Sequence, residues 1–335
     1  MHAIGIDIGG TKIAGALVTE AGGIVREDRR PTPAGDPGAI LDAVVAMIER
    51  LAAGQDVRAA GVAAAGFIDS VQSTVYYAAN ISWRNEPFRA RLTERLDLDI
   101  TIDNDANAAG WAEFRFGAGR AVTDMTMLTI GTGVGGAIVT NDRLFRGGFG
   151  AGAELGHMRV VPGGLPCGCG ARGCIEQYGS GRALLRMANE IADASANAGA
   201  NVGGSAGVNA GASTGGIGRG LAQARADHGA LTGEHIAALI LAQDAGALLA
   251  IRQLGGWLGQ ACASLSAILD PQLFVFGGGV AVAGELLIDS IRQSCLAHLP
   301  ARGFHPEPGF AIAELVNNAG VVGAADLARL HQQAR

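Results

Sequence analysis

Residues 3–18 read Ala-Ile-Gly-Ile-Asp-Ile-Gly-Gly-Thr-Lys-Ile-Ala-Gly-Ala-Leu-Val, two β-prone runs on either side of a short glycine turn. The pattern predicts a hairpin with strands at 3–8 and 13–18. It occurs again at 125–140, where two β-prone runs enclose Gly-Thr-Gly-Val-Gly-Gly. Helical periodicity, for example at 38–51, places helices between the strands. We therefore predict an α/β protein in which one architecture occurs twice.

Both turns have the composition of a phosphate-binding loop. Backbone N–H groups in such a turn can hold phosphate oxygens, and a carboxylate such as Asp7 beside them can hold a metal through water. In dinucleotide and P-loop motifs the glycine loop opens a helix, whereas here a second strand follows. Either turn alone is equally consistent with an ordinary β-turn. The pairing of the two is what favours phosphate binding.

A polar stretch, Asp-Asn-Asp-Ala-Asn at residues 103–107, lies between a predicted strand at 98–103 and a predicted helix. Helix capping explains one Asp or Asn at such a position. Here four polar residues occupy five positions at the carboxyl edge of a strand, where α/β sheets place ligands. We interpret the stretch as a catalytic or binding site.

A histidine and three cysteines follow within residues 154–176, with the spacing His-x9-Cys-x-Cys-x4-Cys. One imidazole and three thiolates are a usual ligand set of a closed, structural zinc site. The alternative is a cluster of buried free thiols. We predict that zinc fixes the conformation of this loop. Glu154 and Glu176 flank the ligands and are candidates for the functional side chains that the loop positions.

Two further stretches have distinctive compositions. A predicted strand at 273–276 runs into Gly277-Gly278-Gly279, which fits either close approach to a flat ligand such as a purine or tight helix–strand packing. Residues 192–220 are almost wholly Ala, Gly, Asn and Ser. Because that composition buries little apolar surface, we expect a flexible surface insertion there.

The composition bounds the class of protein. With 335 residues, 49% of them hydrophobic, the chain can build two domains with their own cores. A net charge of −6 without a basic run argues against nucleic acid as a partner. No apolar run reaches the length of a membrane span and no signal peptide is recognised, so we expect no membrane partner and a cytoplasmic protein with reduced cysteines.

These motifs resemble the ROK family of bacterial sugar kinases and sugar-responsive repressors. The resemblance runs from Ile4 to about Leu330 and rests on both glycine turns, the Asn104–Ala109 stretch and the cysteine loop. Residues 111–119, 157–162 and 176–182 look most like the ATP-dependent glucokinases of actinobacteria. The resemblance implies an actin-like, ribonuclease-H-type α/β fold with a cleft between two domains. Its implied smaller domain is 1–119 with a C-terminal helix at about 318–335, and its larger domain is 120–317.

The resemblance also implies an activity, the phosphorylation of glucose at its 6-hydroxyl by ATP, with Asp105 as the general base. The implied glucose ligands are Gly66, Asn104, Asp105, Glu154, His157 and Glu176. Asp7 would serve Mg²⁺, and ATP would lie on Gly9, Gly10, Thr11, Lys12, Gly131, Thr132, Gly133, Gly278 and Gly279. The implied ligands of a structural Zn²⁺ are His157, Cys167, Cys169 and Cys174. A homodimer or homotetramer is also implied.

Three alternatives stay open at this point. The sugar could be mannose, fructose, N-acetylmannosamine or N-acetylglucosamine, since epimers differ by one hydroxyl. A sugar-sensing repressor of the family would carry a helix-turn-helix ahead of the first phosphate motif, which here starts at residue 4. The donor could be polyphosphate, although family members that use it generally lack the cysteine loop. One departure softens the role of Gly66, because Ala65 stands where the family often has proline.

Overall fold

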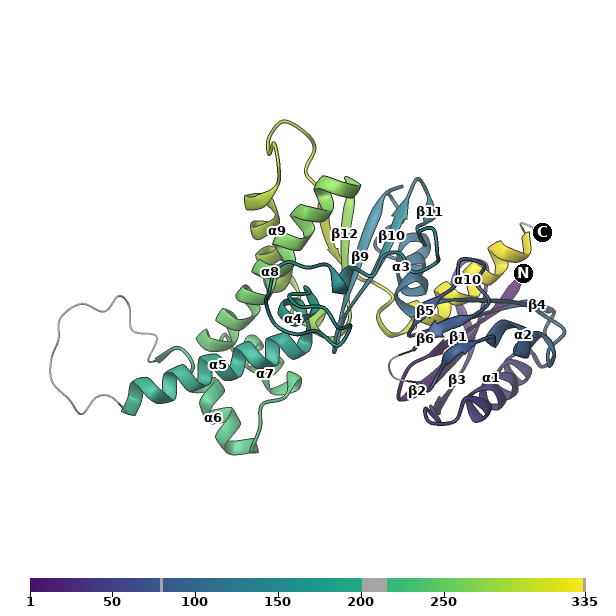
Figure 1. The fold of residues 1–335 in the computed structure, drawn as a ribbon, viewed down its shortest axis with the longest axis horizontal. Coiled ribbons are helices and arrows are strands. Elements are labelled where there is room, and N and C mark those ends of the chain that lie inside the picture. The colour runs from purple at the N-terminus through teal and green to yellow at the C-terminus, as the bar shows by residue number, and fades with distance from the viewer. Residues whose placement is uncertain (79–80, 201–215, 334–335) are drawn as a thin grey trace. The chain divides into compact units, whose positions relative to one another are not determined.

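The computed structural model describes residues 1–78, 81–200 and 216–333 (Figure 1). The chain forms two compact units. The first consists of Met1–Leu128, Gly136–Glu154 and Ala313–Arg335, and the second of Thr129–Gly135 and Leu155–Ile312. The first unit therefore includes Gly136–Glu154, a segment that the expected boundary at residue 119 assigns to the larger domain.

The first sheet lies in the first unit and has the strand order β3-β2-β1-β4-β8. Its strands are β1 (His2–Ile8), β2 (Lys12–Val18), β3 (Ile24–Pro31), β4 (Val57–Ala64) and β8 (Asp99–Asn104). β1 and β2 pair antiparallel, as the sequence predicts, and β4 and β8 run parallel to β1. Asp7 is opposite Ala63, which is opposite Asp103. The acidic ends of β1 and β8 are therefore in register at one edge of the sheet.

The two faces of this sheet pack against different helices. Ile4, Ile6 and Ile8 alternate along β1 and share a buried core with α1 (Pro37–Ala52). The opposite face has glycines, because the backbone of α10 (Ala319–Gln333) passes directly over it. A Cβ on Gly5 would lie 1.7 Å from the Val321 carbonyl oxygen. Helix α3 (Asp105–Phe116) packs beside α10.

The second sheet repeats the first. Its order is β11-β10-β9-β12-β13, with β9 (Met125–Ile130), β10 (Val134–Thr140), β11 (Arg143–Leu144), β12 (Leu273–Gly277) and β13 (Gly309–Ile312). When the strands of each sheet are counted in chain order, both sheets read 3-2-1-4-5. β12 and β13 are parallel, as β4 and β8 are. The predicted duplication is thus confirmed in the topology.

Helices dominate the second unit. They are α4 (Glu176–Gly179), α5 (Gly181–Ala200), α6 (Arg219–His228), α7 (Gly233–Leu241), α8 (Ala245–Leu269) and α9 (Glu285–His298). α8 and α9 lie side by side (Figure 1), and glycines of α8 permit the close approach. A Cβ on Gly259 would lie 2.5 Å from the Ile291 carbonyl oxygen.

The insertion expected at 192–220 is shorter than predicted. Residues 192–200 continue α5, and α6 begins at Arg219. Alanine is the best helix former, so an alanine-rich segment extends a helix that already has a buried face. Ala192 and Ser195 are buried, and the Ser195 hydroxyl accepts a hydrogen bond from the Gly218 N–H at 2.8 Å. The rest of the expected insertion, 201–215, lies outside the described residues.

A three-stranded sheet in the first unit was not predicted. It has the order β5 (Phe67–Ile68), β6 (Val75–Tyr77) and β7 (Arg84–Glu86), and α2 (Phe88–Thr93) follows it. Its strands are too short to produce a periodic pattern. Among the described residues no single helix has the length and apolar character to cross a membrane, and α7 with α8 meets that criterion only as a pair bent by 109°.

Candidate active site

Asp7 stands at the end of β1, beside the first glycine turn. The turn is held by bonds from the Gly9 N–H to the Lys12 carbonyl (3.0 Å) and from the Thr32 hydroxyl to the Gly9 carbonyl (2.7 Å). Burial raises the pKa of Asp7 to about 6; the nearby charge of Asp105 also raises it, and Lys12 opposes the shift. The structure thus brings Asp7 and Asp105 into electrostatic contact within one unit.

Asn104 caps helix α3, so the capping explanation holds for this residue. Its side-chain oxygen accepts hydrogen bonds from the N–H groups of Ala106 (2.9 Å) and Asn107 (3.1 Å). Its amide donates to the Gly66 carbonyl at 3.1 Å, which connects two of the predicted sugar ligands. The second amide hydrogen is compatible with a sugar contact. Asp105 follows in the first turn of the helix, and burial raises the pKa of its carboxyl.

Asp103 lies beneath this pair and is only 3% exposed. Its Oδ2 accepts from both Nε (2.8 Å) and Nη2 (2.7 Å) of Arg146, and from Gln72 at 3.0 Å. Its Oδ1 accepts from the Asn104 N–H (2.9 Å) and from the Asn107 amide (3.0 Å). Asp103 is therefore a buried anchor that fixes the start of α3, and it is not free to act as a base.

The cysteine loop gathers four ligand atoms, from His157, Cys167, Cys169 and Cys174, all within 4.8 Å of one another. The Cys169 and Cys174 sulfurs are 3.7 Å apart, and so are the Cys167 sulfur and His157 Nδ1. A tetrahedral zinc site with Zn–S bonds of about 2.3 Å has sulfurs roughly 3.7 Å apart. The donor set and spacing therefore fit a structural Zn²⁺.

Backbone turns bring these ligands together. Cys167 donates its N–H to the Ala171 carbonyl (2.9 Å) and accepts from Gly170 (3.0 Å). Gly173 has φ of +79°, and a Cβ there would lie 1.7 Å from the Val161 carbonyl oxygen. No other residue fits at Gly173 without moving the loop.

The second glycine turn meets the end of the cysteine loop at Glu176. One carboxylate oxygen of Glu176 accepts from the Val134 N–H at 3.3 Å, and a Cβ on Gly133 would lie 2.2 Å from the same oxygen. The other oxygen is 3.4 Å from Nη2 of Arg182, whose Nε donates to the Thr132 carbonyl at 3.0 Å. A predicted sugar ligand and a predicted phosphate turn are thus in direct contact.

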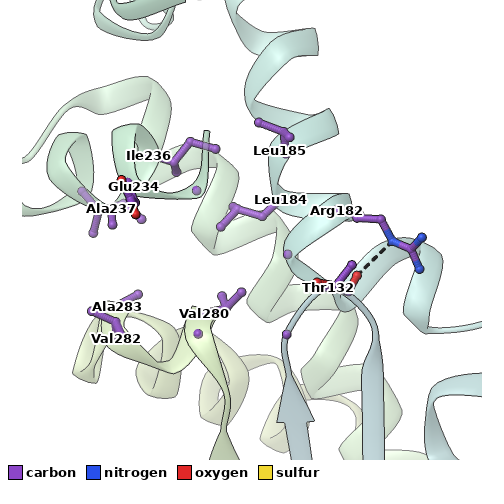
Figure 2. A pocket seen from close by; sticks show the side chains of 15 residues that line it. Thr132, Arg182, Leu184, Leu185, Glu234, Ile236, Ala237, Val280, Val282 and Ala283 are labelled. Atoms are coloured by element: carbon purple, nitrogen blue, oxygen red, sulfur yellow. Dashed lines mark hydrogen bonds between the residues drawn. The ribbon is translucent and has the colours of Figure 1, made fainter. Parts of the chain in front are cut away.

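A cavity of about 530 Å³ opens beside this turn (Figure 2). Gly131, Thr132 and Gly279 lie at its wall, together with Arg182 and Glu234. Its apolar lining comes from α5, α7 and the turn after β12: Leu184, Leu185, Ile236, Ala237, Ile240, Val280, Val282 and Ala283. A phosphate turn next to an apolar slot is the arrangement that a nucleotide requires.

The glycines after β12 have two different roles. Gly279 lines the cavity, and its predicted contact with the nucleotide stays a prediction. Gly278 does not line the cavity; its φ is +86°, and a Cβ there would lie 2.5 Å from the Ile130 carbonyl oxygen. For Gly278 the packing explanation is therefore supported. The sequence analysis did not predict Arg182, Glu234 or the apolar side chains as lining a cavity. Those on α5 and α7 lie in sequences that read as ordinary amphipathic helices.

The chain is similar to known proteins along nearly its whole length. The model of the ROK family matches residues 3–331. The chain is 40% identical over 326 residues to the glucokinase of Streptomyces coelicolor, covering 97% of both chains. It is 31% identical over 332 residues to the N-acetylmannosamine kinase of Escherichia coli, covering 98% of this chain and 99% of that one.

Among solved structures, the chain is similar to a ROK family glucokinase from Streptomyces griseus in complex with glucose and AMPPNP. The TM-score is 0.81 and the identity 41%, with 98% of this chain and 100% of that chain covered. The expected actin-like, duplicated two-domain α/β fold is confirmed. Together, the family match, the identities and the shared fold establish that this chain belongs to the ROK family.

Proposed function

We propose that this protein transfers the γ-phosphoryl group of ATP to the 6-hydroxyl of glucose. The observation that carries the proposal is the 41% identity, over 98% of the chain, to the Streptomyces griseus glucokinase in complex with glucose and AMPPNP. Asp105 is the proposed general base. Its place at the carboxyl edge of the first sheet and its burial suit a proton acceptor.

The proposed reaction requires one proton acceptor for the sugar hydroxyl and positive charge or N–H donors to balance the negative charge of the phosphates. A primary alcohol is a weak nucleophile, so Asp105 takes the hydroxyl proton while the sugar oxygen bonds to the γ-phosphorus. The bond from that phosphorus to the β,γ-bridging oxygen breaks, and ADP leaves with the electron pair. The backbone N–H groups of the turns at Gly9–Thr11 and Gly131–Gly133 are proposed to hold the phosphates in line.

Two metals are proposed, each with its own residues. Asp7 would hold Mg²⁺, which when bound adds positive charge beside the phosphates. His157, Cys167, Cys169 and Cys174 would hold the structural Zn²⁺. His157 Nδ1 faces Cys167, so Nε2 of the same ring is the nitrogen available to a sugar hydroxyl. Together with Glu154 and Glu176, His157 would offer hydrogen-bond acceptors to the glucose hydroxyls from a loop held by the metal.

The test of this proposal is an ADP-release assay on zinc-replete protein with Mg-ATP and a panel of hexoses. We expect turnover with glucose and little with fructose or the N-acetylated sugars. The match to an N-acetylmannosamine kinase makes that sugar the second candidate. Protein that binds glucose but phosphorylates no hexose would overturn the proposal in favour of a sugar sensor.

Asp105→Asn tests the general base. The variant should bind glucose normally and lose about 10²- to 10⁴-fold in kcat, the usual contribution of general-base catalysis. Asp97→Asn is the matched control, since Asp97 is an exposed acid just ahead of the same strand and should leave kcat unchanged. Near-normal turnover of Asp105→Asn would remove Asp105 as the base.

A further inference from the structure

This inference rests on the proposed function and concerns Arg182, which lies at the N-terminal end of α5. Its side chain is 64% exposed, and the guanidinium contacts two predicted subsites at once. Nε donates to the Thr132 carbonyl of the phosphate turn at 3.0 Å, and Nη2 lies 3.4 Å from the Glu176 carboxylate. Figure 2 shows the bond to Thr132 at the wall of the cavity.

Among the described residues that line this cavity, Arg182 is the one with a positive charge. A triphosphate on the Gly131–Gly133 turn would bring several negative charges to the edge where Arg182 stands. The planar guanidinium binds phosphate oxygens through two parallel N–H groups, which gives phosphate an advantage over a single carboxylate contact. The cavity therefore offers Arg182 a stronger partner than the one it has.

The present contact with Glu176 is weak. Its length of 3.4 Å exceeds the 2.7–2.9 Å typical of charge-assisted hydrogen bonds. The Glu176 side chain is only 15% exposed, and its bond from the Val134 N–H is also long, at 3.3 Å. The oxygen that faces Arg182 also lies 3.9 Å from the Cys167 sulfur. A shielded carboxylate held by such long contacts can exchange the one with Arg182 for a sugar hydroxyl at little cost.

We propose that Arg182 is a positioning residue that couples the two substrates. Nucleotide phosphates draw Nη2 away from Glu176, while Nε keeps its bond to the Thr132 carbonyl. The released oxygen of Glu176 then accepts a hydrogen bond from glucose. Nucleotide thereby tightens glucose binding and, by linkage, glucose tightens nucleotide binding by the same factor.

The test is calorimetric titration of glucose into the full-length, zinc-replete protein with and without saturating Mg-AMPPNP. We expect AMPPNP to lower the glucose Kd about two- to five-fold, the range given by losing one exposed ion pair. In Arg182→Gln the ratio of the two Kd values should fall to about one. In Arg252→Gln, an exposed arginine on α8, it should stay at the wild-type value.

Because the readout is a ratio within one protein, a general loss of affinity cancels. The reverse titration, AMPPNP with and without glucose, must give the same factor by linkage and so checks the measured ratio. A purely structural role of Arg182 would change the two Kd values and leave their ratio unchanged. Coupling that survives in Arg182→Gln, or that is absent from the wild type, overturns the inference and leaves the proposed function standing. Absence of glucose binding in all three proteins overturns both.

Discussion

Asp7 and Asp105 are two carboxyls in one unit, each with a pKa above its ordinary value. Burial is the main cause for both, and the charge of Asp105 adds to the shift at Asp7. Such carboxyls disfavour their own ionised form in the native protein. We infer that the free protein stores destabilisation at this site, which a bound cation and bound substrate would relieve.

Replacing Asp7 should therefore stabilise the Mg²⁺-free protein. The native pKa of Asp7 is about 6 against 3.8 as its ordinary value. As pH rises from 3.8 to 6, the unfolded chain loses this proton while the native protein keeps it, so native stability falls across that window. At pH 7.5, Asp7→Asn should raise the free energy of unfolding by up to about 3 kcal/mol, with almost no gain below pH 4.

Urea unfolding at the two pH values measures this difference, and Asp56→Asn is the control. Asp56 has an 81% exposed side chain in the same unit, so its removal should change little at either pH. The same Asp7→Asn protein should have a raised requirement for Mg²⁺. An Asp7→Asn protein no more stable than wild type at pH 7.5 would contradict the burial argument.

At the level of single residues, the sequence identified the polar stretch at 103–107 but not which role each of its residues has. Asp103, Asn104 and Asp105 all suit a helix start. Only their partners in the folded protein show that Asp103 is a buried anchor and Asn104 the helix cap. The partner of Asp103, Arg146, is 43 positions away. Nothing local in the sequence indicates that pairing.

Among the elements, the cysteine loop is the one that a single substitution tests most sharply. Cys169→Ser should release zinc, because three donors no longer close the tetrahedral site. Glucose affinity should then fall about 10- to 100-fold, the usual loss when the support of a metal site is disturbed. Nucleotide affinity should change far less, since none of the four proposed zinc ligands is among the residues that line the cavity.

Metal analysis and separate titrations of glucose and AMPPNP measure these effects. Cys295→Ser is the matched control, because Cys295 is buried on α9 beside Ser266, away from the loop. It should keep zinc and glucose binding. A zinc-free Cys169→Ser protein that binds glucose with wild-type affinity would show that the loop does not support the sugar site.

Elements were predictable where periodicity was strong. Helix α1, expected at 38–51, differs from that range by one residue at each end. The prediction failed where the pattern was short or diluted. β5–β7 have two or three residues each, and residues 192–200 are helical although their composition suggested a loop.

In the whole molecule, the duplication was visible in the sequence because both halves start with the same hairpin. The strand order 3-2-1-4-5 could not be predicted from the sequence, because pairing between distant strands leaves no local pattern. Nor does periodicity show that α10 returns to the first unit. That expectation came from the family resemblance alone.

The return of α10 makes a prediction about glycine. A Cβ on Gly61 would lie 1.9 Å from the Ala324 carbonyl oxygen, and this neighbour is helix backbone that cannot turn aside. Gly61→Ala should therefore lower the free energy of unfolding by about 1–3 kcal/mol or more. Gly35→Ala, at a site with open space, should be nearly neutral. Urea unfolding of both variants is the measurement, and equal stabilities would contradict the close packing.

The same helix sets an order of events during protein synthesis. β1 carries Gly5 and Asp7 and is synthesised before α10, the helix that covers its glycine face. Until translation reaches Ala319, the nascent chain holds one face of its first sheet uncovered. Chains that stop before α10 should therefore be aggregation-prone protein that chaperones must hold, rather than weakly active enzyme.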